Sequence, residues 1–151
     1  MEITSDIVKQ LRDKTGISVM ECKKALVEAD GDMDKALAIL SAKSAVAAAK
    51  KADRELGAGT VASYIHSTLQ MGSLVLLSSE TDFVSKNDEF VALARDIAMH
   101  AAAMRPATVE EVLTQPFIKD PSKTVGDMIA AATQKFGERV VLSNLAFFSV
   151  K

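Results

Sequence analysis

Four side chains in this sequence are suited to acid-base or nucleophilic chemistry: the single cysteine, the single tyrosine and the two histidines. Cys22 lies in an apolar helical stretch with no histidine nearby in sequence, which favours a buried structural thiol over a nucleophile. Tyr64 and His66 alternate onto one face of a predicted strand, and Asp82 is the carboxylate that would complete an acid-base group. We favour a structural role for Tyr64 and His66 over an enzyme that uses this acid-base group. His100 lies among alanines and is assigned to a helix surface or to packing.

The sequence offers little for a cofactor or a metal. A lone cysteine forms no internal disulfide and no cysteine-based zinc site, and two histidines leave few other ligands. The glycine-containing stretch 57–60 precedes a predicted strand, whereas a phosphate-binding loop opens a helix. We therefore expect no cofactor, no metal site and no nucleotide of the chain's own, and we predict a protein that is not an enzyme.

The segment 78–87 joins an apolar strand to the start of a helix and is the strongest candidate site. In it an aromatic residue, Phe83, lies beside a carboxylate, Asp82, among polar neighbours. One interpretation folds Phe83 back onto Phe90 as a helix staple. The other, which we favour, projects the ring outward with its charged neighbour, as in a hot spot for binding another protein.

Composition narrows the class of protein. The 151 residues carry 18 basic and 20 acidic side chains, for a net charge of −2, and the isoelectric point is near 5.7. This balance argues against a dedicated nucleic-acid binder, whose domain is usually strongly basic. No apolar run approaches the ~20 residues that span a bilayer, and the acidic N-terminus is unlike a signal peptide. A cytoplasmic protein, or a mature form already trimmed, is expected.

Three helices are predicted before residue 52. The first covers about 5–14 and ends at Gly16, the second begins after a capping box that pairs Ser18 with Glu21, and the third begins at Asp32 and continues toward Lys51. Three short helices joined by tight turns form a small bundle similar to a ubiquitin-associated domain. We assign residues 1–52 to this module and 53–59 to a linker.

The remainder, 60–151, is predicted to be an α+β core domain: a small antiparallel sheet covered by helices on one face. Strands are expected near 61–66 and 74–77, with Met71 and Gly72 in the turn between them, and a closing strand within 139–150. Helices are expected from Asn87 to Pro106, after a second capping box at 108–111, and over 124–136.

Several motifs together resemble the translation elongation factor Ts family. They occur in the expected order and span nearly the whole chain. The segments that carry the resemblance are Leu11–Gly16, Met20–Leu26, Gly31-Asp32, Tyr64-Ile65-His66, Thr81-Asp82-Phe83-Val84, Ile97–His100 and Lys135-Phe136-Gly137-Glu138.

The resemblance implies a guanine-nucleotide exchange factor for elongation factor Tu, which it would bind in both the GDP-bound and nucleotide-free states, with no direct contact to nucleic acid. Asp82 and Phe83, flanked by Thr81 and Val84, would enter the partner near its magnesium ion. A docking face on the helical module would consist of Arg12, Val19, Met20 and Lys23.

Two further expectations complete the hypothesis. Longer family members repeat the sheet subdomain, so a short form with a single core is expected to form a homodimer. The apolar run Leu145, Phe147, Phe148 and Val150 is suited to such an edge, although a simple buried strand is favoured. The alternative to exchange is a ubiquitin-associated-like interaction module without exchange activity.

Overall fold

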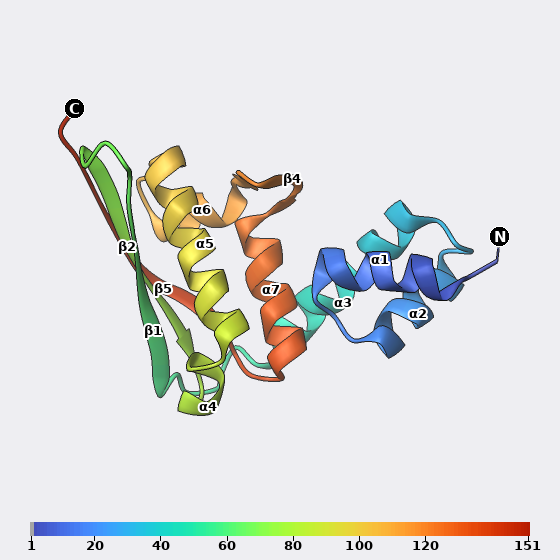
Figure 1. Cartoon of the computed structure of the whole chain (residues 1–151). Helices are drawn as coiled ribbons and strands as arrows, with labels where there is room; N and C mark the ends of the chain where they lie inside the picture. The colour runs from blue at the N-terminus through green and yellow to red at the C-terminus, as the bar shows by residue number, and fades with distance from the viewer. Residues whose placement is uncertain (1) are drawn as a thin grey trace.

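The computed structural model describes residues 2–151, and its first part is a bundle of three helices (Figure 1). They are α1 (Ser5–Thr15), α2 (Val19–Glu28) and α3 (Met33–Lys50). Each begins at a residue whose side-chain oxygen accepts a backbone N–H of the first turn, which satisfies a donor that the helix itself leaves free. These N-cap residues are Thr4, Ser18 and Asp32.

The bundle has its own apolar core. Leu11, Cys22, Leu26 and Leu40 are fully or almost fully buried in it, one or more from each helix. Gly16 ends α1 in the left-handed conformation, with φ of 70°, where a residue with a Cβ would be strained. The predicted helices, and the cap at Gly16, are confirmed.

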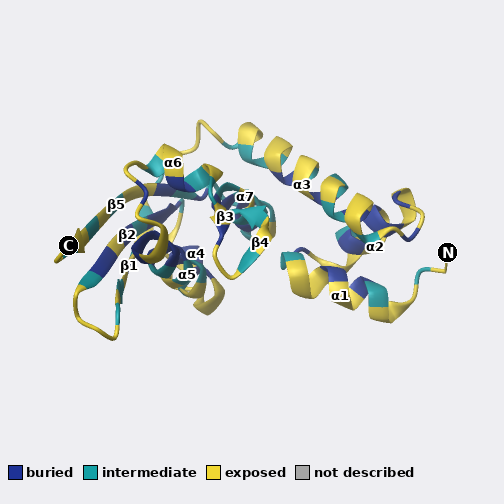
Figure 2. Cartoon of the chain, turned by 90° about the horizontal axis from the view of Figure 1, so that it is seen from above, coloured by how far each residue is buried: buried dark blue, intermediate teal, exposed yellow. Residues whose placement is uncertain are grey.

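The bundle meets the rest of the molecule mainly through α3, whose second half packs on α7 (Val125–Phe136). The buried Ser44 hydroxyl donates to the side chain of Gln134 there, at 2.5 Å. Elsewhere a cleft of about 670 Å³, lined by residues of α1, α3, α5 (Asp88–Met104) and α7, separates the bundle from the core. Figure 2 shows the bundle at one end, the sheet at the other and α7 between them.

The sheet has three antiparallel strands in the order β1-β2-β5. Their bounds are Ala58–Ile65 for β1, Met71–Ser79 for β2 and Val141–Ser149 for β5. The prediction that Met71 and Gly72 form the turn was wrong, because both pair within β2 and the turn occupies 66–70. A Cβ at Gly72 would lie 2.6 Å from Cδ1 of Ile65, the end of an exposed side chain, and 3.0 Å from the carbonyl oxygen of Tyr64.

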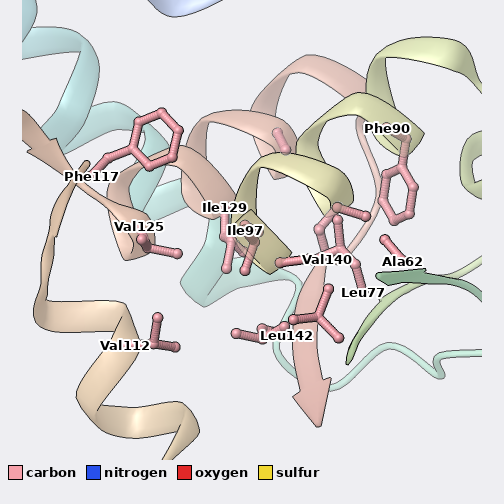
Figure 3. Close-up of a cluster of buried hydrophobic side chains, with 14 of the residues drawn as sticks. Ala62, Leu77, Phe90, Ile97, Val112, Phe117, Val125, Ile129, Val140 and Leu142 are labelled. Carbon is pink, nitrogen blue, oxygen red and sulfur yellow. The ribbon is translucent and has the colours of Figure 1, made fainter. Parts of the chain in front are cut away.

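One face of the sheet is covered by α5, and the buried side chains of β1, β2 and β5 meet those of α5 and α7 there (Figure 3). The remaining elements complete this layer. They are the one-turn helix α4 (Asp82–Ser85), α6 (Val109–Thr114), and the short hairpin of β3 (Pro116–Phe117) and β4 (Asp120–Thr124), which was not predicted. The α+β class, with helices on one face of a small antiparallel sheet, is confirmed.

The other face of the sheet is uncovered in the part of the chain that the structure describes. Val61 and Phe148 are 68% and 77% exposed on it, and Ile65, Leu74 and Val150 are exposed as well. β5 is an edge strand, so the prediction of a simple buried closing strand was wrong for Phe148 and Val150.

Two predicted capping boxes are only half formed. Ser18 accepts the N–H of Glu21, but the Glu21 carboxylate pairs with Lys24 instead of returning to Ser18. Thr108 likewise accepts the N–H of Glu111, whose carboxylate accepts from Ala107. The reciprocal box occurs at the start of α7. No helix within 2–151 has the length and apolar character needed to cross a membrane.

Candidate functional site

The segment that carries Phe83 is ordered as one helical turn. β2 ends at Ser79, Thr81 occupies the N-cap position in an extended conformation, and α4 follows over Asp82–Ser85. The turn lies at the end of the sheet where β1 begins and β2 ends, away from the turn that joins those two strands (Figure 1). The sequence predicted a loop between the strand and the next helix here, and not a helical turn.

The inner side of this turn is anchored in the core. Val84 is buried among the apolar side chains between the sheet and α5. Ser85 is buried beside it, and its carbonyl accepts a hydrogen bond of 2.6 Å from the hydroxyl of Thr60 on β1. Val84 therefore lies inside the protein, where it holds the turn in place.

The outer side presents Phe83, which is 88% exposed and is the most exposed large apolar residue of the described chain. Asp82 and Thr81 beside it are exposed too. The staple interpretation was wrong: Phe90 is fully buried and packs edge-on against Phe136, with ring centroids 6.0 Å apart. Successive residues of a helical turn point about 100° apart, so the same turn buries Val84 and projects Phe83.

Glu138 is a residue of this site that sequence analysis did not identify. Its Oε1 accepts the N–H groups of Glu80 and Thr81 at 3.1 and 3.0 Å, and its Oε2 accepts from the Thr81 hydroxyl at 2.7 Å. The only sequence signal was its place in the stretch 135–138, which carried the family resemblance. Pattern analysis has no means of pairing residues 57 positions apart.

The predicted docking residues of the helical module are all on its surface. Arg12 lies on α1, whereas Val19, Met20 and Lys23 lie on the first turns of α2, and each of the four is exposed. Met20 is 67% exposed. The spacing of four residues places Val19 and Lys23 on the same side of α2, and Met20 lies next to them.

The structure separates the three residues of the enzyme alternative. Tyr64 and His66 are neighbours, with ring centroids 6.3 Å apart, and Nδ1 of His66 is bonded to Thr68. The strand register pairs Ile65 with Gly72 and Ala58 with Ser79, so Asp82 follows at the opposite end of β1. Eight strand residues at about 3.3 Å each put it roughly 25 Å away. The hypothesis of an enzyme that uses Tyr64, His66 and Asp82 together was therefore wrong.

The other two candidate side chains are structural. His100 is fully buried and stacks on Phe117; its Nδ1 accepts the N–H of Ile118, so Nε2 carries the proton shared with Gln115. Cys22 is buried in the bundle, and this burial raises the pKa of its thiol. Within 2–151, no three histidine, cysteine or acidic side chains come together as metal ligands would.

The geometry therefore defines an α+β protein that presents an anchored phenyl ring and a carboxylate on one turn. The family model for elongation factor TS matches residues 80–151. Elongation factor Ts of Clostridium botulinum is 45% identical over 148 residues in strain ATCC 19397 and 44% identical in strain 657, each match covering 98% of this chain. That of Alkaliphilus oremlandii is 36% identical, over 99% of this chain and 90% of the relative.

The chain belongs to the elongation factor Ts family. It spans 48% of the length of the Clostridium botulinum relatives, about half. The resemblance to this family that the sequence motifs indicated is therefore confirmed.

Proposed function

We propose that this protein is a guanine-nucleotide exchange factor for elongation factor Tu and acts in the cytoplasm during translation elongation. The α4 turn is the wedge: Phe83, with Asp82 beside it, enters the partner near its magnesium ion and phosphates. The single observation that supports this most strongly is a phenyl ring that is 88% exposed on a turn anchored to the core.

The physical basis is differential binding. A GTPase holds GDP through backbone N–H groups around the phosphates and through a magnesium ion that requires nearly octahedral oxygen ligands. A phenyl ring that becomes buried in a displaced form of this cradle stabilises that form by about 1.5–3 kcal/mol. Because the ring binds only the displaced form, it shifts the equilibrium toward GDP release. No covalent bond is made or broken.

The anchoring of the turn matters for this role. Val84 and Ser85 fix the inner side of α4, so the ring is held outward before the partner arrives. A group already ordered in its binding position loses less conformational entropy on association. The helical module supplies docking contacts through Arg12, Val19, Met20 and Lys23, whose exposed apolar and charged side chains are free to meet the partner.

The test is release of fluorescent GDP from purified elongation factor Tu with the chain at substoichiometric concentration. We expect faster release with the wild-type chain and with Leu69→Ala, which removes a side chain of similar exposure from the turn between β1 and β2. Phe83→Ala should lose the acceleration. Binding to elongation factor Tu without faster GDP release would refute exchange and favour the interaction module.

We further propose that a second copy of the chain covers the open face of the sheet. The face is apolar from β1 to the edge strand β5, and Val61, Leu74 and Phe148 are exposed on it. A two-fold axis would bring the same patch of each copy together, as in most homodimers. Sedimentation equilibrium should show a dimer that Phe148→Asp converts to a monomer. A wild-type monomer at high concentration would refute this part of the proposal.

A further inference from the structure

α4 differs from the other helices of the described chain at its N-terminus. Each of the others begins at a residue whose side chain accepts an N–H of the first turn, whereas Thr81 makes no such bond. The Thr81 hydroxyl donates outward, to Oε2 of Glu138 at 2.7 Å. Oε1 of the same carboxylate accepts the backbone N–H groups of Thr81 and Glu80. A distant carboxylate thus holds the start of this turn.

The segments around Glu80 and Glu138 are joined by hydrogen bonds in both directions. The Glu80 carboxylate accepts the N–H of Arg139, while the Glu138 carboxylate accepts the N–H of Glu80. Arg54, in the connection between α3 and β1, donates to Glu80 at 3.4 Å and to the carbonyl of Gly137 at 3.3 Å. The side chain of Arg139 in turn donates to the carbonyl of Arg54 at 2.9 Å. Glu138 is therefore itself fixed in place before any partner binds.

We propose that Glu138 is the positioning residue of the wedge: by holding Thr81 it fixes the direction in which Phe83 projects. The inference rests on the proposed function, since it concerns the same turn. A helix of one turn is not stable by itself, so its direction depends on what holds its two ends. Ser85 is bonded to Thr60 at one end, and Glu138 is the partner of Thr81 at the other.

Without Glu138 the ring would have to be ordered during insertion, and this cost falls on the step that releases GDP. Docking through the helical module is independent of that turn. Loss of Glu138 should therefore lower the maximal rate of GDP release by a larger factor than it raises the factor concentration that gives half of that rate. Hydrogen bonds to a charged acceptor are stronger than neutral ones. Losing three of them should lower the maximal rate of GDP release by roughly tenfold or more.

The experiment measures stopped-flow release of fluorescent GDP from elongation factor Tu across a range of factor concentrations. Glu138→Ala should lower the maximal rate roughly tenfold or more while the half-saturating concentration changes by less than about threefold. Glu138→Gln keeps an oxygen for the two N–H groups and should recover most of the rate. Glu111→Ala is the matched control, because that carboxylate also accepts a backbone N–H, that of Ala107 before α6. It should exchange like wild type.

A second pair of readouts separates positioning from general destabilisation. In the free chain, the Ser85 amide, which bonds to the carbonyl of Thr81, should exchange its hydrogen at least several-fold faster in Glu138→Ala than in wild type. Adding Phe83→Ala to Glu138→Ala should lower the rate far less than Phe83→Ala does alone, because a misdirected ring contributes little.

Fully additive losses, or a rate for Glu138→Ala equal to that of Glu111→Ala, would overturn the inference. If Phe83→Ala alone left GDP release unchanged, the proposed function would fail. A loss in Phe83→Ala with none in Glu138→Ala would overturn only the positioning role.

Discussion

Phe83→Ala should remove exchange activity while leaving the fold intact, and Phe90 provides the contrast. Both rings follow β2 and lie seven positions apart, but one is 88% exposed and the other is fully buried. Truncating an exposed side chain usually changes the free energy of unfolding by no more than about 0.5 kcal/mol. Truncating a buried phenyl costs about 3–5 kcal/mol, a large share of the ~5–15 kcal/mol that stabilises a typical domain.

The functional loss follows from the burial that only the bound state supplies. A phenyl ring that passes from water into the partner contributes about 1.5–3 kcal/mol. About 1.4 kcal/mol corresponds to a factor of ten, so Phe83→Ala should lower the rate of GDP release between one and two decades. Phe83→Leu keeps much of the apolar volume and should lose less than about tenfold.

Stopped-flow GDP release and urea unfolding, measured on the same samples, check both halves of this reasoning. Phe83→Ala should unfold at the wild-type urea midpoint and exchange slowly. Phe90→Ala should unfold at a much lower midpoint, and its folded fraction should retain exchange. A normal exchange rate in Phe83→Ala, or a midpoint as low as that of Phe90→Ala, would refute the assignment of the ring to the partner.

Three other substitutions test the packing. Gly72→Ala should lower the free energy of unfolding by roughly 1 kcal/mol, because its Cβ would lie 3.0 Å from the backbone carbonyl oxygen of Tyr64, whereas the exposed end of Ile65 can turn aside. His100→Phe removes two part-buried hydrogen bonds, to Gln115 and to the N–H of Ile118, and should lower Tm, at about 0.5–1.5 kcal/mol for each. Burial raises the pKa of the Cys22 thiol, so stability from that thiol is present below the unfolded pKa of about 8.5 and is lost as pH rises through the folded value. Cys22→Ala should therefore lose less stability than wild type between neutral and alkaline pH.

Each of these three has an outcome that contradicts it. An unchanged urea midpoint for Gly72→Ala would mean that β1 and β2 have room to separate. A wild-type Tm for His100→Phe would show that water or other groups replace its two bonds. Parallel stability profiles for Cys22→Ala and wild type above pH ~9 would contradict the effect of burial on the thiol.

The features that sequence analysis predicted correctly depend on local chemistry. Ser18 and Asp32 accept N–H groups within three residues of themselves, and Gly16 takes the left-handed conformation in the residue after α1. Phe83 follows the same logic, because an aromatic residue among polar neighbours at the end of a strand is out of place in a core. These signals lie within a few positions of the residues they describe.

The features it missed depend on contacts between distant segments. Gly72 is a residue type typical of turns, but it lies in β2, where it pairs with Ile65 of β1 and Phe148 of β5. The β3-β4 hairpin contains Asp120 and Pro121, which carry no strand propensity. Glu138 reaches Thr81 across 57 positions, and only the folded chain brings them together.

Helix α3 fixes the orientation of the three-helix bundle relative to the α+β core. Ala36 and Leu40 of this single 18-residue helix belong to the core of the bundle, and Ser44, four positions on, is bonded to α7. One residue added between Leu40 and Ser44 would turn the first helices by about 100° about the α3 axis and advance them by about 1.5 Å. All side chains would still be present, but Met20 and Phe83 would no longer be placed to contact one rigid partner at the same time.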